Sequence, residues 1–493
     1  MVPRNKNQNS AFQHQFMKNL SLIFFLAIAT ILTISCEPEE EKLSGSSSIN
    51  LRFSTDTVIF DTLLTIRTSI TKRLRIFNPS KNAVSISSIR LGKGKQSAYT
   101  IIANGKFGEE INNEVLFGGD SLLVLVDVDI DPLNKNLPYL VKDSIVVDWN
   151  GQSAHVKLVA WGQDANFING EVLCDVTWTA DRPYVIYNFV VVDSLCTLTI
   201  DSGAKIFLDN GAAMIVQGTL KVLGDSANRV TFRNTRFDDN YQKAPGQWQG
   251  LIFMETSRNN EIHFADIENG QTGIGVGYTI LQLTDGSSLL WPELGAATTE
   301  IQIHNTSIRH MSTAGILAFS SELTMTNSEI YNSQLMVGNF GGGTYLYEHC
   351  TFSNQRSDFL LDAPSFQFSD EYLKLAMFID GYELLEDLNM TIRNSIIWGP
   401  NKEEFYFLQS EKANFTLEMN SSIIKTEEDY GTTNYSSIES NFPGFVDLFD
   451  FNYQLDSLSF ARDRGIDLGY KYDILGRPRD SKPDIGAYER IDR

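Results

Sequence analysis

Three aspartates at two-residue spacing form the most regular carboxylate pattern in the chain. Asp127, Asp129 and Asp131 alternate with apolar residues, so a single strand would place all three on one face. Carboxylate oxygens are the ligands that Ca²⁺ prefers, which makes this face a candidate Ca²⁺ site. The alternative is an exposed strand face whose charges discourage edge-to-edge aggregation. The spacing alone does not separate the two interpretations.

The other groups that could do chemistry are sparse. Asp238-Asp239 is the only Asp-Asp pair, and its polar neighbours are typical of a solvated turn. Four histidines lie in the repeats described below, namely His263, His304, His310 and His349. Histidines that line a repeat are more often stacked structural groups than metal ligands, and no Cys-x-x-Cys pair is present. The sequence therefore predicts no catalytic residues and no transition-metal site.

The elements that would position any site belong to a repeat of 22 residues. The copies begin at Ile303, Met325 and Tyr347, and the pattern returns at Ile392 and, less regularly, at Met419 and Ile262. Each copy contains a short alternation of apolar and polar residues, which is typical of a half-buried strand. A fixed period of this length indicates a solenoid, and parallel crossovers are right-handed in about 98% of cases. We expect a right-handed parallel β-helix.

An asparagine occupies the bend of several copies. Stacked coils would place Asn305, Asn327 and Asn394 in one structural ladder, with His349 between the last two. Asparagine tolerates unusual backbone angles, and stacked Asn side chains can bond one another. Short strands separated by glycines from 198 to 232 fit the first coils of the same solenoid.

The N-terminus is predicted to be a secretion signal. Lys18 precedes a run of 15 mostly apolar residues, Leu20 to Ile34, which suits a signal peptide and is short for a membrane span. Ser35-Cys36 resembles a bacterial lipobox, which implies lipidation of Cys36. The alternative is an ordinary secretory signal with a chance cysteine. Met17 is an alternative start, which would leave residues 1–16 upstream of the protein.

An acidic and serine-rich tether follows at residues 37–48. The run from Glu37 to Lys42 resembles the surface-export signal of Bacteroidetes-type lipoproteins, which implies exposure outside the outer membrane. The alternative is a solvated tether without a signal. A net charge of −21 and a pI of about 4.7 argue against a nucleic-acid partner. Cys174 and Cys196 could form a disulfide in an oxidising envelope, whereas Cys350 is expected to be buried.

Residues 49–164 differ from the repeats. Alternating strands separated by Asn78-Pro79 and Gly118-Gly119 predict an all-β sandwich, and their order resembles bacterial immunoglobulin-like domains. Within the solenoid, predicted at 165–440, insertions are expected near 278–299 and near 364–390, the second with a short helix. Exposed aromatic rings could bind sugars by stacking. The candidates are Trp291, Trp398, Tyr241 and Tyr278.

The last segment, 441–493, is the most family-specific part of the chain. It reads Phe442-Pro443-Gly444-Phe445-Val446-Asp447 and, near its end, Asp484-Ile485-Gly486-Ala487-Tyr488-Glu489. This resembles the ending of pectin-lyase-like β-helix proteins with a choice-of-anchor region, and we expect it to cap the open end of the solenoid. The family's hydrolases carry His-Gly and Arg-Ile-Lys motifs, but neither motif is in this sequence.

These features predict an all-β protein in which an immunoglobulin-like β-sandwich precedes a right-handed parallel β-helix. The expected function is that of an outer-membrane lipoprotein, exposed on the cell surface, that binds a polysaccharide or an outer-membrane protein complex without catalysis. A polysaccharide lyase or glycoside hydrolase of pectin-lyase-like fold, and an adhesin, remain as alternatives. No cofactor other than the Ca²⁺ considered above is expected.

Overall fold

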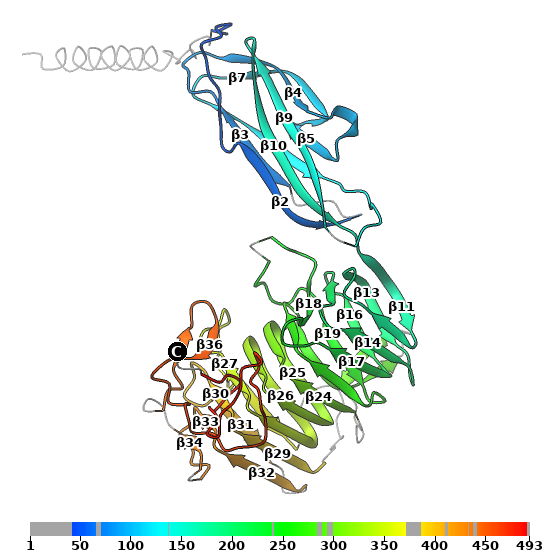
Figure 1. Cartoon of the computed structure of the whole chain (residues 1–493), viewed down its shortest axis with the longest axis vertical. Helices are drawn as coiled ribbons and strands as arrows, with labels where there is room; N and C mark the ends of the chain where they lie inside the picture. Colours follow the sequence, from blue (N-terminus) through cyan, green and yellow to red (C-terminus); the bar gives the residue numbers. More distant parts are fainter. Residues whose placement is uncertain are drawn as a thin grey trace, which may run out of the picture. The chain divides into compact units, whose positions relative to one another are not determined.

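The computed structural model describes residues 42–65, 71–136, 138–238, 241–282, 288–292, 299–370, 386–409, 413–431, 433–436 and 441–490 (Figure 1). Across these ranges the chain forms strands and one short 3₁₀ helix, η1 (Gly94–Gln96), so the predicted all-β class is confirmed. Within the same residues no helix has the length and apolar character needed to cross a membrane. The chain divides into a smaller unit (1–58, 71–127 and 143–158) and a larger unit (59–70, 128–142 and 159–493).

Two five-stranded sheets form the N-terminal part. The first has the order β1 (Arg52–Phe53), β3 (Lys72–Phe77), β8 (Ser121–Val128), β5 (Tyr99–Ala103) and β6 (Lys106–Gly108). The second has the order β2 (Thr57–Leu64), β10 (Gln152–Gln163), β9 (Tyr139–Trp149), β4 (Val84–Leu91) and β7 (Glu110–Leu116). Strand β3 shows the alternation that the sequence predicted, because Leu74 and Ile76 are buried whereas Arg73 and Arg75 are exposed.

The rest of the strands, from β11 to β34, stack into one parallel β-helix. Three strands and the turns between them make one coil, and the strands other than β23 pair in parallel with their counterparts in neighbouring coils. The predicted period of 22 residues is confirmed where Ile303 pairs with Met325 and Met325 pairs with Tyr347. The stack therefore grows by adding coils along one axis, so a long chain needs no single large core.

The strand bounds of the solenoid are as follows: β11 (Asn166–Leu173), β12 (Val176–Trp178), β13 (Tyr184–Val192), β14 (Thr197–Asp201), β15 (Lys205–Leu208), β16 (Ala213–Val216), β17 (Thr219–Leu223), β18 (Val230–Asn234), β19 (Gly250–Met254), β20 (Asn260–His263), β21 (Ala265–Glu268), β22 (Thr272–Gln282), β23 (Ser288–Pro292), β24 (Glu300–His304), β25 (Ser307–Thr326), β26 (Glu329–Glu348), β27 (Thr351–Ser353), β28 (Phe366–Ser369), β29 (Leu388–Arg393), β30 (Ile396–Trp398), β31 (Phe405–Leu408), β32 (Phe415–Asn420), β33 (Ile423–Ile424) and β34 (Tyr435–Ser436).

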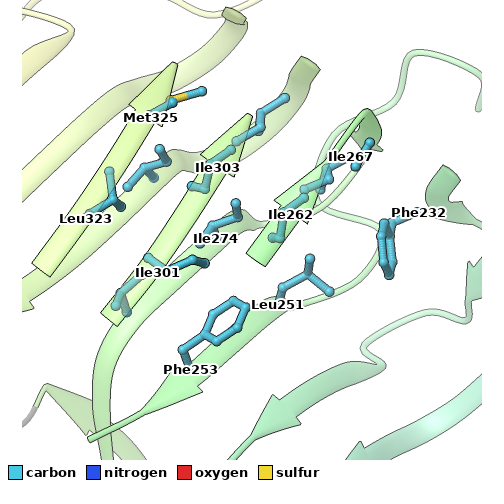
Figure 2. Close-up of a cluster of buried hydrophobic side chains, with 14 of the residues drawn as sticks. Phe232, Leu251, Phe253, Ile262, Ile267, Ile274, Ile301, Ile303, Leu323 and Met325 are labelled. Carbon is cyan, nitrogen blue, oxygen red and sulfur yellow. The ribbon is translucent and has the colours of Figure 1, made fainter. Parts of the chain in front are cut away.

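The interior of the stack is a continuous apolar core. Figure 2 shows how Ile262, Ile303 and Met325 project into it from successive coils, and all three are fully buried. Phe232, Leu251 and other labelled side chains in this view belong to the same cluster. Burying a side chain of this size stabilises the fold by about 1.5–3 kcal/mol, so each added coil contributes several such terms.

The bend after β24 recurs in the following coils. At each of the four positions of the predicted ladder, the residue has a left-handed backbone conformation. The φ angles are 52° at Asn305, 46° at Asn327, 52° at His349 and 48° at Asn394. Asparagine adopts this conformation at lower cost than most residues. The expected stack of positions is thus present. The expected bonding between neighbouring Asn side chains is wrong, however, because Asn305 donates to the Asp473 carbonyl at 2.8 Å and Asn327 accepts from Arg479 at 3.0 Å.

The C-terminal segment (residues 441–490) supplies these partners. It contains a small antiparallel pair, β35 (Phe445–Asp447) and β36 (Asn452–Leu455), and then lies along the side of the coils. Asn394 donates to the Ile466 carbonyl at 2.7 Å, and Asn305, several coils away, contacts the same segment. The predicted end cap is therefore wrong. The side of the stack carries buried polar groups that need hydrogen bonds, and the segment satisfies them.

The two predicted insertions differ in the structure. Strand β23 returns antiparallel to the end of β22, with Thr279 paired to Trp291, so this excursion is a hairpin. Near the second position, β28 pairs in parallel with β26 and belongs to a coil, which makes the excursion narrower than 364–390. The short helix predicted there falls on residues 371–385, outside the described residues.

Candidate functional site

The predicted cysteine pair lies at equivalent positions of two neighbouring coils. Cys174 and Cys196 are 22 residues apart and form a disulfide with a Cα–Cα distance of 4.7 Å. Cys350 is a buried free thiol, and burial raises its pKa to about 12, so it is protonated and unreactive at neutral pH. The proposed lipid site, Cys36, lies outside the described residues.

The four aromatic candidates do not gather in one place. Trp398 is 2% exposed and packs against Phe442, so its assignment as a sugar platform is wrong. Tyr278 is partly buried with its ring edge-on to Phe319, and burial raises its pKa above the usual range. Tyr241 is partly buried and stacks on the Arg236 guanidinium at 3.8 Å. Trp291 lies on β23, and its side chain is outside the described part.

The carboxylates and histidines named from the sequence do not form a ligand set either. Strand β8 ends at Val128, so Asp129 and Asp131 follow the strand, and the single face expected for the three aspartates is wrong. Among the described residues, the three metal-binding side chains whose ligand atoms lie within 4.8 Å of one another are Cys174, Asp175 and Cys196, and the two sulfurs are bonded to each other.

The histidines instead bond to protein groups. Nδ1 of His304 lies 2.8 Å from the Thr326 hydroxyl, and Nδ1 of His310 lies 2.6 Å from the Asn332 amide. His349 bonds the Asn394 amide at 2.8 Å through Nε2. Burial lowers the pKa of all three rings, which holds them neutral at physiological pH.

A cluster of charged side chains lies on the outer side of β18, β21 and β25. Phe232 and Ile267 point into the core, so their neighbours Arg233 and Glu268 point outward. Glu268 is paired in register with Arg309 on the next coil. Two residues earlier along the same strands, Asp266 pairs in register with Ser307, which gives a second row of outward side chains.

Ion pairs connect the two rows into one network. Arg309 contacts Asp266 at 3.0 Å and Glu268 at 3.1 Å. Arg229 contacts the other oxygen of Asp266 at 3.0 Å, and Arg233 lies 3.6 Å from Glu268. Positive and negative side chains alternate along the stack, so each carboxylate can pair with two arginines.

The network keeps Asp266 and Arg309 charged. Burial alone would raise the pKa of the Asp266 carboxyl, but Arg309 and Arg229 hold it below its usual range. Burial opposes the charge on Arg309, yet the surrounding Tyr331, Glu268 and Asp266 raise its pKa well above the usual value. Asp266 therefore remains a carboxylate, and it is a poor general acid because its proton is lost at low pH.

A cavity of about 580 Å³ opens over this network, and every residue that lines it belongs to the larger unit. Lys205, Phe207, Arg233 and Phe237 line it together with the ion-paired acids. Phe207 and Phe237 meet edge to face with ring centroids 4.9 Å apart. The cavity thus combines cationic donors with aromatic rings, a composition that suits binding of a small polar ligand.

None of these network residues was identified from the sequence. A signal did exist, because Arg233, Glu268 and Arg309 each directly follow an apolar strand residue of the repeat, namely Phe232, Ile267 and Ile308. Aligning the copies by that position would have placed the three charges in one column. The Asn bend that defines the repeat is absent from the copy that begins at Ile262, so the Asn pattern does not reveal this column.

Comparison with known proteins supports the fold. A family model described as "Right handed beta helix region" matches residues 186–351, in agreement with the predicted handedness. No curated protein matches the sequence. The match supports the right-handed β-helix fold and does not indicate an activity.

Similar solved structures include a protein of unknown function from Porphyromonas gingivalis W83 (9% identity, TM-score 0.18), where 25% of this chain and 59% of that chain are covered. A family 123 glycoside hydrolase from Clostridium perfringens has 8% identity, coverage of 25% and 30%, and a TM-score of 0.18. The PapD-like domain 7 of human CEP192 has 12% identity, coverage of 27% and 94%, and a TM-score of 0.16. The chain spans less than two thirds of the first two, and these scores carry no functional argument.

Proposed function

We propose that this protein is a lipid-anchored outer-membrane protein, exposed on the cell surface, that binds a polysaccharide or a surface protein complex without chemical conversion. The observation that carries the non-catalytic part is the state of Asp266 and Glu268, two of the three acids that line the cavity. Asp266 and Glu268 are each held by arginines, and a carboxylate bonded in this way is not free to donate or remove a proton.

A second observation supports binding over hydrolysis. Strands β16, β19, β22, β25, β26 and β28 form another parallel face, and their registered outward positions are Ile215, Ile252, Gly275, Leu317, Gly338 and Gln367. This described stretch carries no carboxylate at these positions. Glycoside hydrolysis by the usual route needs two acids on one face.

The first experiment is isolation of the protein from gently solubilised outer membrane through an affinity tag at its C-terminus. A stoichiometric membrane protein in the eluate would support the complex form of the proposal. A lone lipoprotein would contradict that form and leave the polysaccharide form to be tested by binding and depolymerisation assays. Release of unsaturated or reducing ends from a glycan would overturn the non-catalytic part.

A matched variant tests the anchor. Cys36→Ser removes the thiol that would carry the lipid, so the variant should leave the membrane fraction while the wild-type protein stays in it. Protease treatment of intact cells distinguishes the two sides of the outer membrane. A wild-type protein that is soluble without detergent would contradict the lipid anchor.

A further inference from the structure

We propose that the cavity over β15, β18 and β21 binds an acidic sugar unit, one that carries a carboxylate or a sulfate group. This inference rests on the proposed binding of a polysaccharide and names the chemical class of that ligand. It follows from which polar groups in the cavity are already bonded and which are not.

The main acceptors of the cavity are occupied. Both oxygens of Asp266 are bonded, one to Arg229 at 3.0 Å and one to Arg309 at 3.0 Å. Glu268 accepts from Arg309 at 3.1 Å through one oxygen and faces Arg233 at 3.6 Å through the other. These two acids therefore have little capacity left for sugar hydroxyls.

Donors remain available in the same cavity. Lys205 is exposed, and within the described part of the chain no acid lies within ion-pair distance of it. Arg233 uses only Nη1 toward Glu268, while its Nε and Nη2 are enclosed and have no hydrogen-bond partner. An enclosed polar group without a partner costs about 1–3 kcal/mol, so an acceptor placed there would relieve that cost.

The geometry of the unpaired atoms indicates the kind of acceptor. Nε and Nη2 lie on one edge of the guanidinium, the edge that binds the two oxygens of a carboxylate or sulfate side by side. The Lys205 side chain offers a second cation. Lys205 lies on the neighbouring coil, two residues along the strand from the position that pairs with Arg233. A surplus of donors with this arrangement favours an oxyanion over a neutral hydroxyl.

Aromatic rings lie beside the cations. Phe237 packs against Phe207, and the Arg233 guanidinium carbon lies 5.8 Å from the Phe237 ring centroid. Because Nε and Nη2 are enclosed, the acid group reaches them only after a local rearrangement of the side chains that cover them. Both rings then offer apolar faces to the C–H groups of the sugar.

The rim limits the charge density of the ligand. Asp181 lines the same cavity and is exposed, so it can accept from sugar hydroxyls but repels a second nearby anion. The cavity is therefore suited to a glycan whose acid groups are spaced apart. It is not suited to a polymer that would place several acid groups in the cavity at once.

The test is calorimetric titration of the purified full-length protein with three oligosaccharides of equal length: one containing uronic acids, one with a sulfated neutral backbone, and the same backbone without sulfate. We expect binding of an acidic ligand at least about tenfold tighter than of the neutral one, and weaker binding at high salt. The first two ligands distinguish a carboxylate from a sulfate as the bound group.

Lys205→Gln and Arg233→Gln should each weaken binding of the acidic ligand about tenfold or more. Lys402→Gln, an exposed lysine on a distant coil, is the matched control and should bind like wild type. Thermal unfolding of each variant verifies that the fold is retained.

The outcomes separate the two proposals. If acidic and neutral ligands bind equally, or if both site variants bind like wild type, the acidic-sugar site is overturned while polysaccharide binding stands. If none of the three ligands binds wild type, this site is overturned, and the polysaccharide form of the proposed function is overturned with it for these ligand classes.

Discussion

The hydroxyl of Tyr488 donates a hydrogen bond to Glu329 at 2.7 Å, although the two residues are 159 positions apart. The other oxygen of Glu329 accepts from Ser307 at 2.9 Å, so a buried carboxyl is bonded on both sides. Burial raises the pKa of Glu329. Glu329 is on β26, which pairs with β25, so this contact joins the C-terminal segment to the strand beside the charged network.

Tyr488→Phe removes that bond and leaves one oxygen of a buried carboxyl without its partner. We expect a loss of about 1–3 kcal/mol in the free energy of unfolding, measured by chemical denaturation. Tyr472→Phe is the control, because the Tyr472 side chain is exposed. Equal stability of the two variants would show that the bond contributes little.

Arg479 and Glu489 form an ion pair at 3.1 Å whose side chains are 1% and 5% exposed. Arg479→Met leaves a buried acid without its counter-charge and should cost about 3–5 kcal/mol of stability. Adding Glu489→Gln in the same chain should restore part of that loss. If the double variant is as unstable as the single one, packing and not charge is the cause.

Acid should destabilise the solenoid through His310. Burial, together with Arg309 and Lys243, lowers the pKa of this ring to about 3, whereas the unfolded value is near 6.5. The folded state therefore binds fewer protons between these pH values, so stability is lost as the pH falls below 6.5, by about 3 kcal/mol at pH 4.5.

His310→Gln keeps an acceptor for the Asn332 amide and removes the titration. Its melting temperature should fall less between pH 7 and pH 4.5 than that of wild type. His155→Gln, at an exposed position, should show the wild-type dependence. Parallel curves for wild type and the His310 variant would contradict this assignment.

The Cys174–Cys196 disulfide closes a loop of 22 residues. Replacing both cysteines by serine should cost about 3 kcal/mol, because the unfolded chain then gains conformational freedom. Reductant should lower the stability of wild type by a similar amount and leave the double variant unchanged. The remaining described cysteine, Cys350, is a buried free thiol and offers no bond to reduce. If reductant also destabilised the double variant, loss of the disulfide would not explain its effect on wild type.

The repeat could be predicted from the sequence because its strands contact copies of themselves at a constant separation. Ile303, Met325 and Tyr347 needed only their spacing to be placed in one column. The C-terminal segment was misplaced because its partners are far away in sequence. Nothing near Arg479 indicates that its guanidinium bonds Asn327.

The candidate site was missed for a related reason. Arg233 and Lys205 are ordinary surface residues when considered alone, and the absence of a partner for Nε and Nη2 of Arg233 is a property of the three-dimensional packing. Trp398 illustrates the opposite error, because a residue type that often binds sugars is here part of the core.

The C-terminal segment also changes how the stack can come apart. A repeat held only by its neighbours can fray one coil at a time from either end. Here Asn305 and Asn394 are bonded to one continuous stretch of chain that is synthesised after all the coils it contacts. Opening of any one of these coils is therefore linked to the others, and this linkage is complete only after the segment 441–490 has left the ribosome.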